Sequence, residues 1–154
     1  MWNAVPGAWR LLILAGVGFG LIKAKQHFSK KKLFISFAIE DKKFRNLLVG
    51  QSKHPDTPFE FADMSVKQPW SRAWKTQCRE RIKGCDGFVV IVSDNTYDAD
   101  GVHWEVKCAE QENIPIMAMY IKNGKKTPKL PIEFNKFKIE TWSWKNIETF
   151  VSGL

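Results

Sequence analysis

The sequence predicts an α/β domain with a central parallel sheet of about five strands and helices on both faces. From residue 32 onward, apolar segments of strand length alternate with amphipathic segments of helix length. This is the order in which β–α–β units are built. The segment Phe88–Val92 (FVVIV) is apolar at every position and rich in β-branched residues. Such a segment is typical of a strand that is buried on both faces of a parallel sheet.

The predicted strands are short apolar runs that lead into polar loops. They cover residues 33–37, 59–62, 88–92, 116–121 and 136–141. The second strand ends at Asp63-Met64-Ser65, and the third ends at Ser93-Asp94-Asn95. Ligands of such sheets bind beyond the carboxyl ends of the strands. These loops are therefore the expected location of a functional site.

The predicted helices follow the strands and carry apolar residues at helical spacing. They cover residues 40–50, about 69–83, 102–113 and 144–151. Gly50 is expected to end the first helix. One face of the second helix carries residues four positions apart: Trp70, Trp74, Cys78 and Ile82. The third helix has a single acid, Glu105, in its first turns, close to the expected ligand edge.

The net charge of +8 is concentrated at the amino terminus. Residues 1–32 contain six basic residues and no acidic one, which leaves 18 basic and 16 acidic residues in the remainder. The folded part is thus nearly neutral, and it has no basic-aromatic recognition pattern. Nucleic acid is therefore not predicted as a partner.

The cysteines and histidines predict neither a disulfide framework nor a metal site. The three cysteines are odd in number and lie in segments that are expected to be helical or buried. This usage favours a reducing compartment. None of the Cys/His spacings is that of a zinc site, so no metal ligands are predicted.

The amino-terminal segment, residues 1–31, is predicted to be a hydrophobic helix with a basic flank, separate from a folded domain at 32–154. Its uncharged core, Leu11–Ile22, has twelve residues, and extension back to Ala4 gives nineteen. A membrane span takes about 20 residues. With the basic flank on the inside, the sequence predicts a single-pass membrane protein whose folded domain is cytoplasmic. A cleaved signal peptide is the main alternative.

Several motifs of the folded part occur in an order that resembles TIR domains. A first strand (LFISF) is followed by a small residue and an acid, and a second leads into a D-x-S loop (FEFADMS). The third strand is preceded by Cys-Asp and followed by S-x-x-T-Y, a helix with V-x-W-E and the strand IPIMAMYI. The resemblance spans about residues 33–121 and is to the bacterial TIR-like branch of Thoeris-type antiphage systems. It implies a flavodoxin-like three-layer fold.

The resemblance also implies an activity. Many TIR domains of this kind cleave NAD⁺ at the bond between nicotinamide and ribose, and the acid of their W-E motif is catalytic. Here that acid is Glu105. NAD⁺ is then the substrate, no cofactor is required, and the role is antiphage immune signalling. Hydrolysis to ADP-ribose and cyclisation to a signal both remain open as outcomes.

The same resemblance implies substrate contacts at the carboxyl ends of the strands. The candidate substrate-binding residues are Phe37, Ala38, Asp63, Met64, Ser65, Ser93, Tyr97 and Trp104. Phe37 and Trp104 are open to a second interpretation as packing residues. Asp63 could instead organise its turn, and Ser93 could instead cap the strand end. Classical TIR enzymes often have an aromatic residue four positions before the catalytic acid, where this chain has Gly101.

Two other functions remain open. A non-catalytic scaffold would assemble through the D-x-S loop, so replacing Glu105 would be harmless whereas changes at Asp63 or Ser65 would abolish assembly. A nucleotide sensor would bind NAD⁺ or a derivative without cleaving it. The resemblance further implies a homo-oligomer and a downstream effector that senses a nucleotide product.

Overall fold

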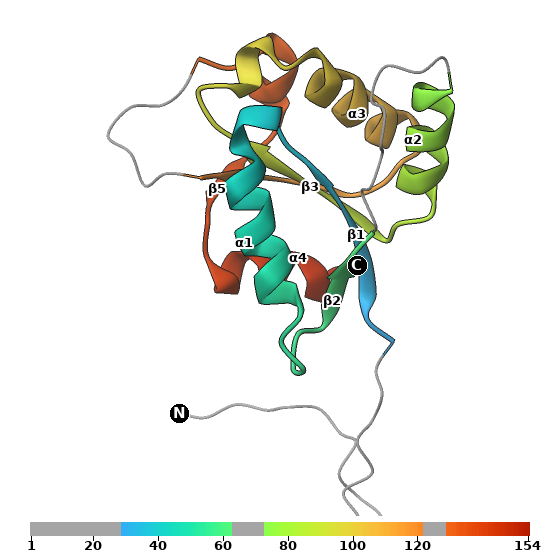
Figure 1. Cartoon of the computed structure of the whole chain (residues 1–154), viewed down its shortest axis with the longest axis vertical. Helices are drawn as coiled ribbons and strands as arrows, with labels where there is room; N and C mark the ends of the chain where they lie inside the picture. Colours follow the sequence, from blue (N-terminus) through green and yellow to red (C-terminus); the bar gives the residue numbers. More distant parts are fainter. Residues whose placement is uncertain (1–28, 63–72, 122–128) are drawn as a thin grey trace, which may run out of the picture.

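A computed structural model describes residues 29–62, 73–121 and 129–154. Its strands form one sheet in the order β2-β1-β3-β4-β5, and every neighbouring pair is parallel. The strands are β1 (Lys31–Ser36), β2 (Phe59–Phe61), β3 (Gly87–Val92), β4 (Ile116–Tyr120) and β5 (Ile139–Thr141). The predicted five-stranded parallel sheet is confirmed (Figure 1).

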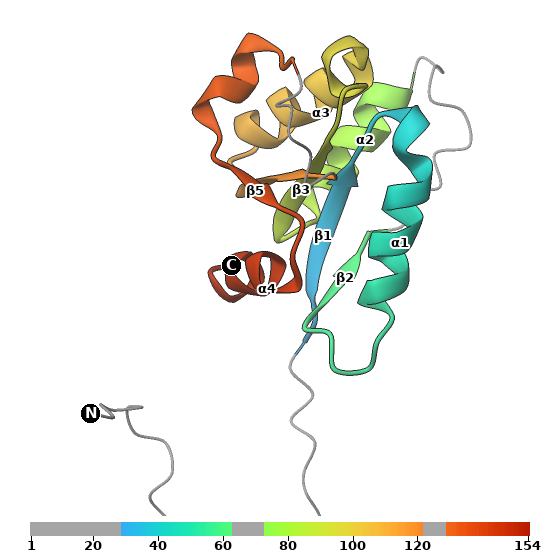
Figure 2. The same cartoon turned by 90° about the vertical axis from the view of Figure 1, so that its left-hand side faces the viewer.

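Helices cover both faces of this sheet and make a three-layer domain. They are α1 (Lys42–Ser52), α2 (Trp74–Lys83), α3 (Asp100–Gln111) and α4 (Trp144–Ser152), with 3-10 helices η1 (Ile39–Asp41), η2 (Thr96–Asp98) and η3 (Ile132–Lys136). The helices α1 and α4 pack on one face, and α2 and α3 pack on the other. Figure 2 shows these layers from the side.

The side chains of each strand alternate between two cores, as the period of a strand requires. Phe34 and Phe88 point to the α2–α3 side, where their rings stack with centroids 5.2 Å apart. Leu33 and Val89 point to the α1–α4 side. All six residues of β3 are buried, since this strand lies between β1 and β4 and is covered on both faces. The prediction from the FVVIV segment is therefore confirmed.

The first helix differs from its predicted bounds. It begins at Lys42, because Asp41 belongs to η1. The buried Asp41 side chain is hydrogen-bonded to the loop that follows β3. The prediction that Gly50 ends this helix was wrong. The helix continues to Ser52, whose Oγ donates to the Val49 carbonyl at 2.7 Å.

The hydrophobic amino-terminal helix of the predicted fold lies outside the described residues, since the description begins at residue 29. In the three ranges that are described, no helix is long and apolar enough to cross a membrane. The longest of them, α3, has 12 residues, whereas a span takes about 20. The prediction of a single-pass membrane localisation is corrected accordingly.

Candidate functional site

The strand order creates one topological switch point at the carboxyl edge of the sheet. From β1 the chain continues to β2 on one side, and from β3 it continues to β4 on the other. In open α/β sheets, ligands bind in the crevice that this divergence leaves between the two central strands. Ser36 is the last residue of β1, and Ser93 directly follows β3. The residues around these two positions make up the candidate site.

Glu105 projects from α3 towards this edge, where both of its carboxylate oxygens have donors. The Ser36 hydroxyl donates to Oε2 at 2.5 Å, and the Cys78 thiol of α2 donates to Oε1 at 3.7 Å. Ser36 is fully buried and Cys78 is nearly so. The carboxylate is therefore held between the end of β1 and the middle of α2.

The surroundings of Glu105 shift its protonation towards neutral pH. Burial raises the pKa of the Glu105 carboxyl to about 7, and the hydrogen bonds from Ser36 and Cys78 oppose this rise. Burial also raises the pKa of the Cys78 thiol, and the nearby Glu105 charge adds to that effect. The thiol thus keeps its proton and is available as a donor. Perturbed carboxyl groups of this kind concentrate at functional sites.

A second polar cluster joins the loops that follow β1 and β3. Asp41 is only 3% exposed. It accepts from the Ser93 hydroxyl at 2.5 Å and from the Asn95 side-chain amide at 3.0 Å. The Ser93 backbone N–H donates to Thr96 Oγ1 at 2.9 Å. This Asp41 cluster ties the two loops together across the switch point.

Three of the predicted substrate contacts lie in two different surroundings. Ser93 lies in the Asp41 cluster. Ala38 is 1% exposed, and its carbonyl accepts from the Asp41 N–H at 2.8 Å. Phe37 packs against the α1–α4 core, with the Arg45 guanidinium 5.4 Å from its ring. The structure thus places Ser93 and Ala38 with the loop cluster and gives Phe37 a packing contact.

The other two described candidates, Trp104 and Tyr97, have ring contacts with other side chains. Trp104 packs against Trp74, with ring centroids 4.9 Å apart. Tyr97 is 38% exposed, and Lys129 Nζ lies 4.0 Å from its ring. The predicted contacts Asp63, Met64 and Ser65 lie outside the described residues.

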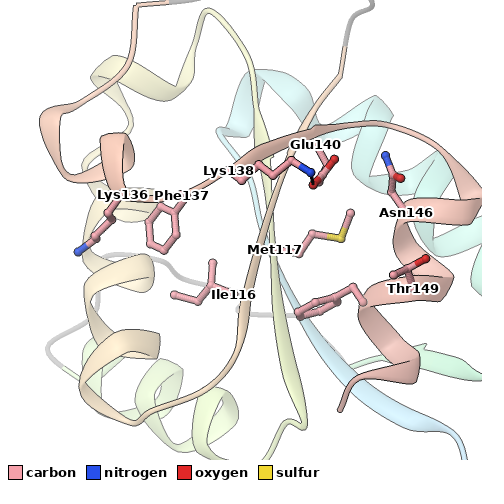
Figure 3. A pocket seen from close by; sticks show the side chains of 9 residues that line it. Ile116, Met117, Lys136, Phe137, Lys138, Glu140, Asn146 and Thr149 are labelled. Atoms are coloured by element: carbon pink, nitrogen blue, oxygen red, sulfur yellow. Dashed lines mark ion pairs between the residues drawn. The ribbon is translucent and has the colours of Figure 1, made fainter.

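Two of the hollows on the described surface lie away from Glu105, which lines neither of them. One, of about 430 Å³, lies beside β5 and reaches Ile116, the first residue of β4. Figure 3 shows its side chains, with the Lys138–Glu140 ion pair at 2.6 Å. The other, of about 500 Å³, is lined by Tyr97 and His103. Tyr97 is therefore placed at a hollow separate from the Glu105 contacts.

Sequence reasoning missed three residues of the candidate site: Ser36, Asp41 and Cys78. Ser36 was detectable, because the alternation of β1 puts it on the same inward face as the core residue Phe34. A serine at such a position needs a hydrogen-bond partner. The sequence predicts Cys78 only as a residue on one face of the second helix, and nothing in this helical spacing indicates the contact with Glu105.

The described ranges contain no group of three or more histidine, cysteine, aspartate or glutamate side chains that is placed to hold a metal ion. Their three cysteines are free and buried. The groups that the described site offers for chemistry include a positioned carboxylate with hydroxyl and thiol donors.

The Asp41 cluster leads to a prediction about stability. Asp41→Asn should lower the free energy of unfolding by about 1–3 kcal/mol, since an amide offers one acceptor oxygen for two half-buried donors. Denaturant unfolding measures this change. Asp56→Asn is the matched control, because the Asp56 side chain is 83% exposed and its loss should change stability by less than about 0.5 kcal/mol. Equal effects of the two substitutions on the free energy of unfolding would contradict the role of Asp41 in stabilising these two loops.

Comparison with known proteins identifies the family. No curated protein matches the chain. Among solved structures, the chain is similar to the TIR domain of the Toll-related receptor TRR-2 from the lower metazoan Hydra magnipapillata, with a TM-score of 0.51 and 14% identity. The match covers 79% of this chain and 91% of that chain, and at this identity it shows the fold alone. The family model described as "Thoeris protein ThsB, TIR-like domain" matches residues 34–126, more than half of the sequence. The chain therefore belongs to the Thoeris ThsB TIR-like family.

Proposed function

We propose that this chain is an NAD⁺ glycohydrolase or ADP-ribosyl cyclase of antiphage immune signalling, with Glu105 as its catalytic residue. The observation that carries the proposal is the Glu105 carboxylate, which Ser36 and Cys78 bind at the carboxyl end of β1. Membership of a Thoeris TIR-like family supports the same reaction.

The proposed reaction needs one carboxylate and no metal or cofactor. The bond between nicotinamide and ribose breaks with its electron pair going to the pyridinium nitrogen, so nicotinamide leaves as a neutral molecule. No general acid is required for this step. The ribose carbon develops positive charge, which a fixed carboxylate stabilises. Water then captures that carbon to give ADP-ribose and a proton, or a nucleophilic group of the bound ADP-ribose captures it to give a cyclic product.

The position of Glu105 suits this task. Its carboxylate is partly removed from water, so its interaction with a nearby positive charge is stronger than at an exposed position. We further propose that the chain acts as a homo-oligomer, as its membership of a TIR-like family implies. A downstream effector that senses the nucleotide product would be the partner in signalling.

Removal of the carboxylate tests the proposal. Glu105→Gln should lower the rate of nicotinamide release from NAD⁺ by at least about 10²–10³-fold, which is the usual loss when one charge-stabilising group is removed. The assay uses the full chain over a range of protein concentrations, and chromatography of the product separates hydrolysis from cyclisation. Glu110→Gln is the matched control, because Glu110 lies on the same helix but forms an ion pair with Lys136.

The control variant should retain the parent rate. Equal rates of nicotinamide release for the parent chain and Glu105→Gln would show that Glu105 has no part in the reaction. No release from any form that demonstrably self-associates would reject the enzymatic proposal as a whole.

The raised pKa of Glu105 predicts the pH dependence of the reaction. The anionic carboxylate is the active form, and burial raises the pKa of this group to about 7. The kcat/KM for nicotinamide release should therefore rise with pH and reach half its plateau value near pH 7. At pH 6 it should be about tenfold lower than the plateau value. A steady-state pH profile measures this midpoint. A flat profile between pH 5 and pH 8 would contradict a titrating carboxylate.

A non-catalytic scaffold is the second candidate. The observation that favours it is that both oxygens of Glu105 already have donors within the chain, as in a purely structural hydrogen-bond network. In that case Glu105→Gln would leave self-association unchanged, and the parent chain would release no nicotinamide. Sedimentation velocity beside the release assay distinguishes the two functions.

A further inference from the structure

The contacts around Glu105 assign roles to two residues that the proposed reaction does not itself require. Ser36 occupies an inward position at the end of a strand whose neighbouring inward residue, Phe34, is part of the apolar core. A buried hydroxyl in such a place needs a partner, and its hydrogen bond is to Glu105. Cys78 lies on a different element, on the buried face of α2, and is bonded to the other carboxylate oxygen.

We propose that Ser36 and Cys78 are positioning residues that fix the orientation of the Glu105 carboxylate and stabilise its anionic form. A carboxylate with one donor can rotate about its last bonds, whereas two donors on separate elements restrict it to one geometry. Hydrogen bonds to a charged acceptor are also about twice as strong as those between neutral groups. The kinetic part of this inference rests on the proposed function, while the effect on Glu105 itself is independent of turnover.

The two donors should contribute unequally. The Ser36 hydroxyl is the closer and stronger donor, at 2.5 Å, and the Cys78 thiol is a weak donor at 3.7 Å. Among the described residues, Cys108 and Arg81 are the other ionisable groups with an electrostatic effect within this cluster. Cys108 interacts electrostatically with Glu105, and Arg81 interacts electrostatically with the Cys78 thiol. Neither is bonded to the carboxylate, so both stay unchanged in the test.

The test follows the protonation of Glu105 directly, in the full chain. Isotope-edited infrared titration detects the protonated carboxyl band of Glu105, which is assigned by its absence in Glu105→Gln. Ser36→Ala should move the midpoint upward by about one pH unit, which corresponds to about a tenfold loss of anionic carboxylate at a given pH below the midpoint. Cys78→Ala should move it in the same direction by a few tenths of a pH unit, a smaller effect because a thiol is the weaker donor.

Matched controls separate this role from general effects of core substitution. Ser52→Ala and Cys85→Ala also remove buried donors, but their partners are the carbonyls of Val49 and Arg81. Both controls should leave the midpoint unchanged. Ser36→Thr retains the hydroxyl and should restore the midpoint, even if its extra methyl group lowers stability.

The midpoint is read only from variants with native circular dichroism, and Cys78→Ala and Ser36→Thr provide independent readings if Ser36→Ala does not fold. An unchanged midpoint in Ser36→Ala, or an equal shift in the controls, would overturn the positioning role. If the expected shifts occur but the parent chain releases no nicotinamide, the positioning role holds and the proposed NAD⁺ cleavage fails. If release occurs, its pH midpoint should shift in parallel with the infrared midpoint.

Discussion

The partial burial of one carboxylate between a strand end and a helix is the constraint on which the rest of this site depends. Transfer of a carboxylate out of water is costly, and the usual response is a raised pKa or a set of hydrogen bonds. Glu105 shows both, since burial raises its pKa to about 7 while Ser36 and Cys78 donate to its two oxygens. The serine that follows the apolar residues Leu33–Ile35 of β1 and the protonated thiol on α2 are the two partners of this one charge.

The linkage between protonation and folding gives this arrangement a cost in stability. The folded pKa of Glu105 lies near 7, above the ordinary value of 4.5. The group therefore favours the folded state most below pH 4.5, and that contribution is lost as the pH rises through 7. The difference amounts to about 3 kcal/mol above neutral pH. A group that weakens the fold at working pH is better explained by chemistry than by architecture, which is the argument for function at Glu105.

Much of the fold was predictable because local patterns determine it, whereas the site depends on contacts between distant segments. The FVVIV segment identified the central strand, and strand–helix alternation identified the parallel sheet. The motif around Glu105 predicted a position close to the carboxyl edge of that sheet, and the Glu105 carboxylate accepts from Ser36 at the end of β1. The contacts of Glu105 with Ser36 and Cys78 join residues 69 and 27 positions away, and no local pattern reports them. Tyr97 and Trp104, which are near Glu105 in sequence, instead contact Lys129 and Trp74.

The most direct measurement is the free energy of unfolding of the parent chain and of Glu105→Gln as a function of pH. The account predicts that the two proteins have similar stability well below pH 4.5, where the carboxyl is protonated in both the folded and the unfolded state. At pH 8 the glutamine variant should be more stable by up to about 3 kcal/mol, because it no longer holds a buried charge. A parent chain that is equally stable or more stable than the variant at pH 8 would contradict the account, since Glu105 would then be a structural group.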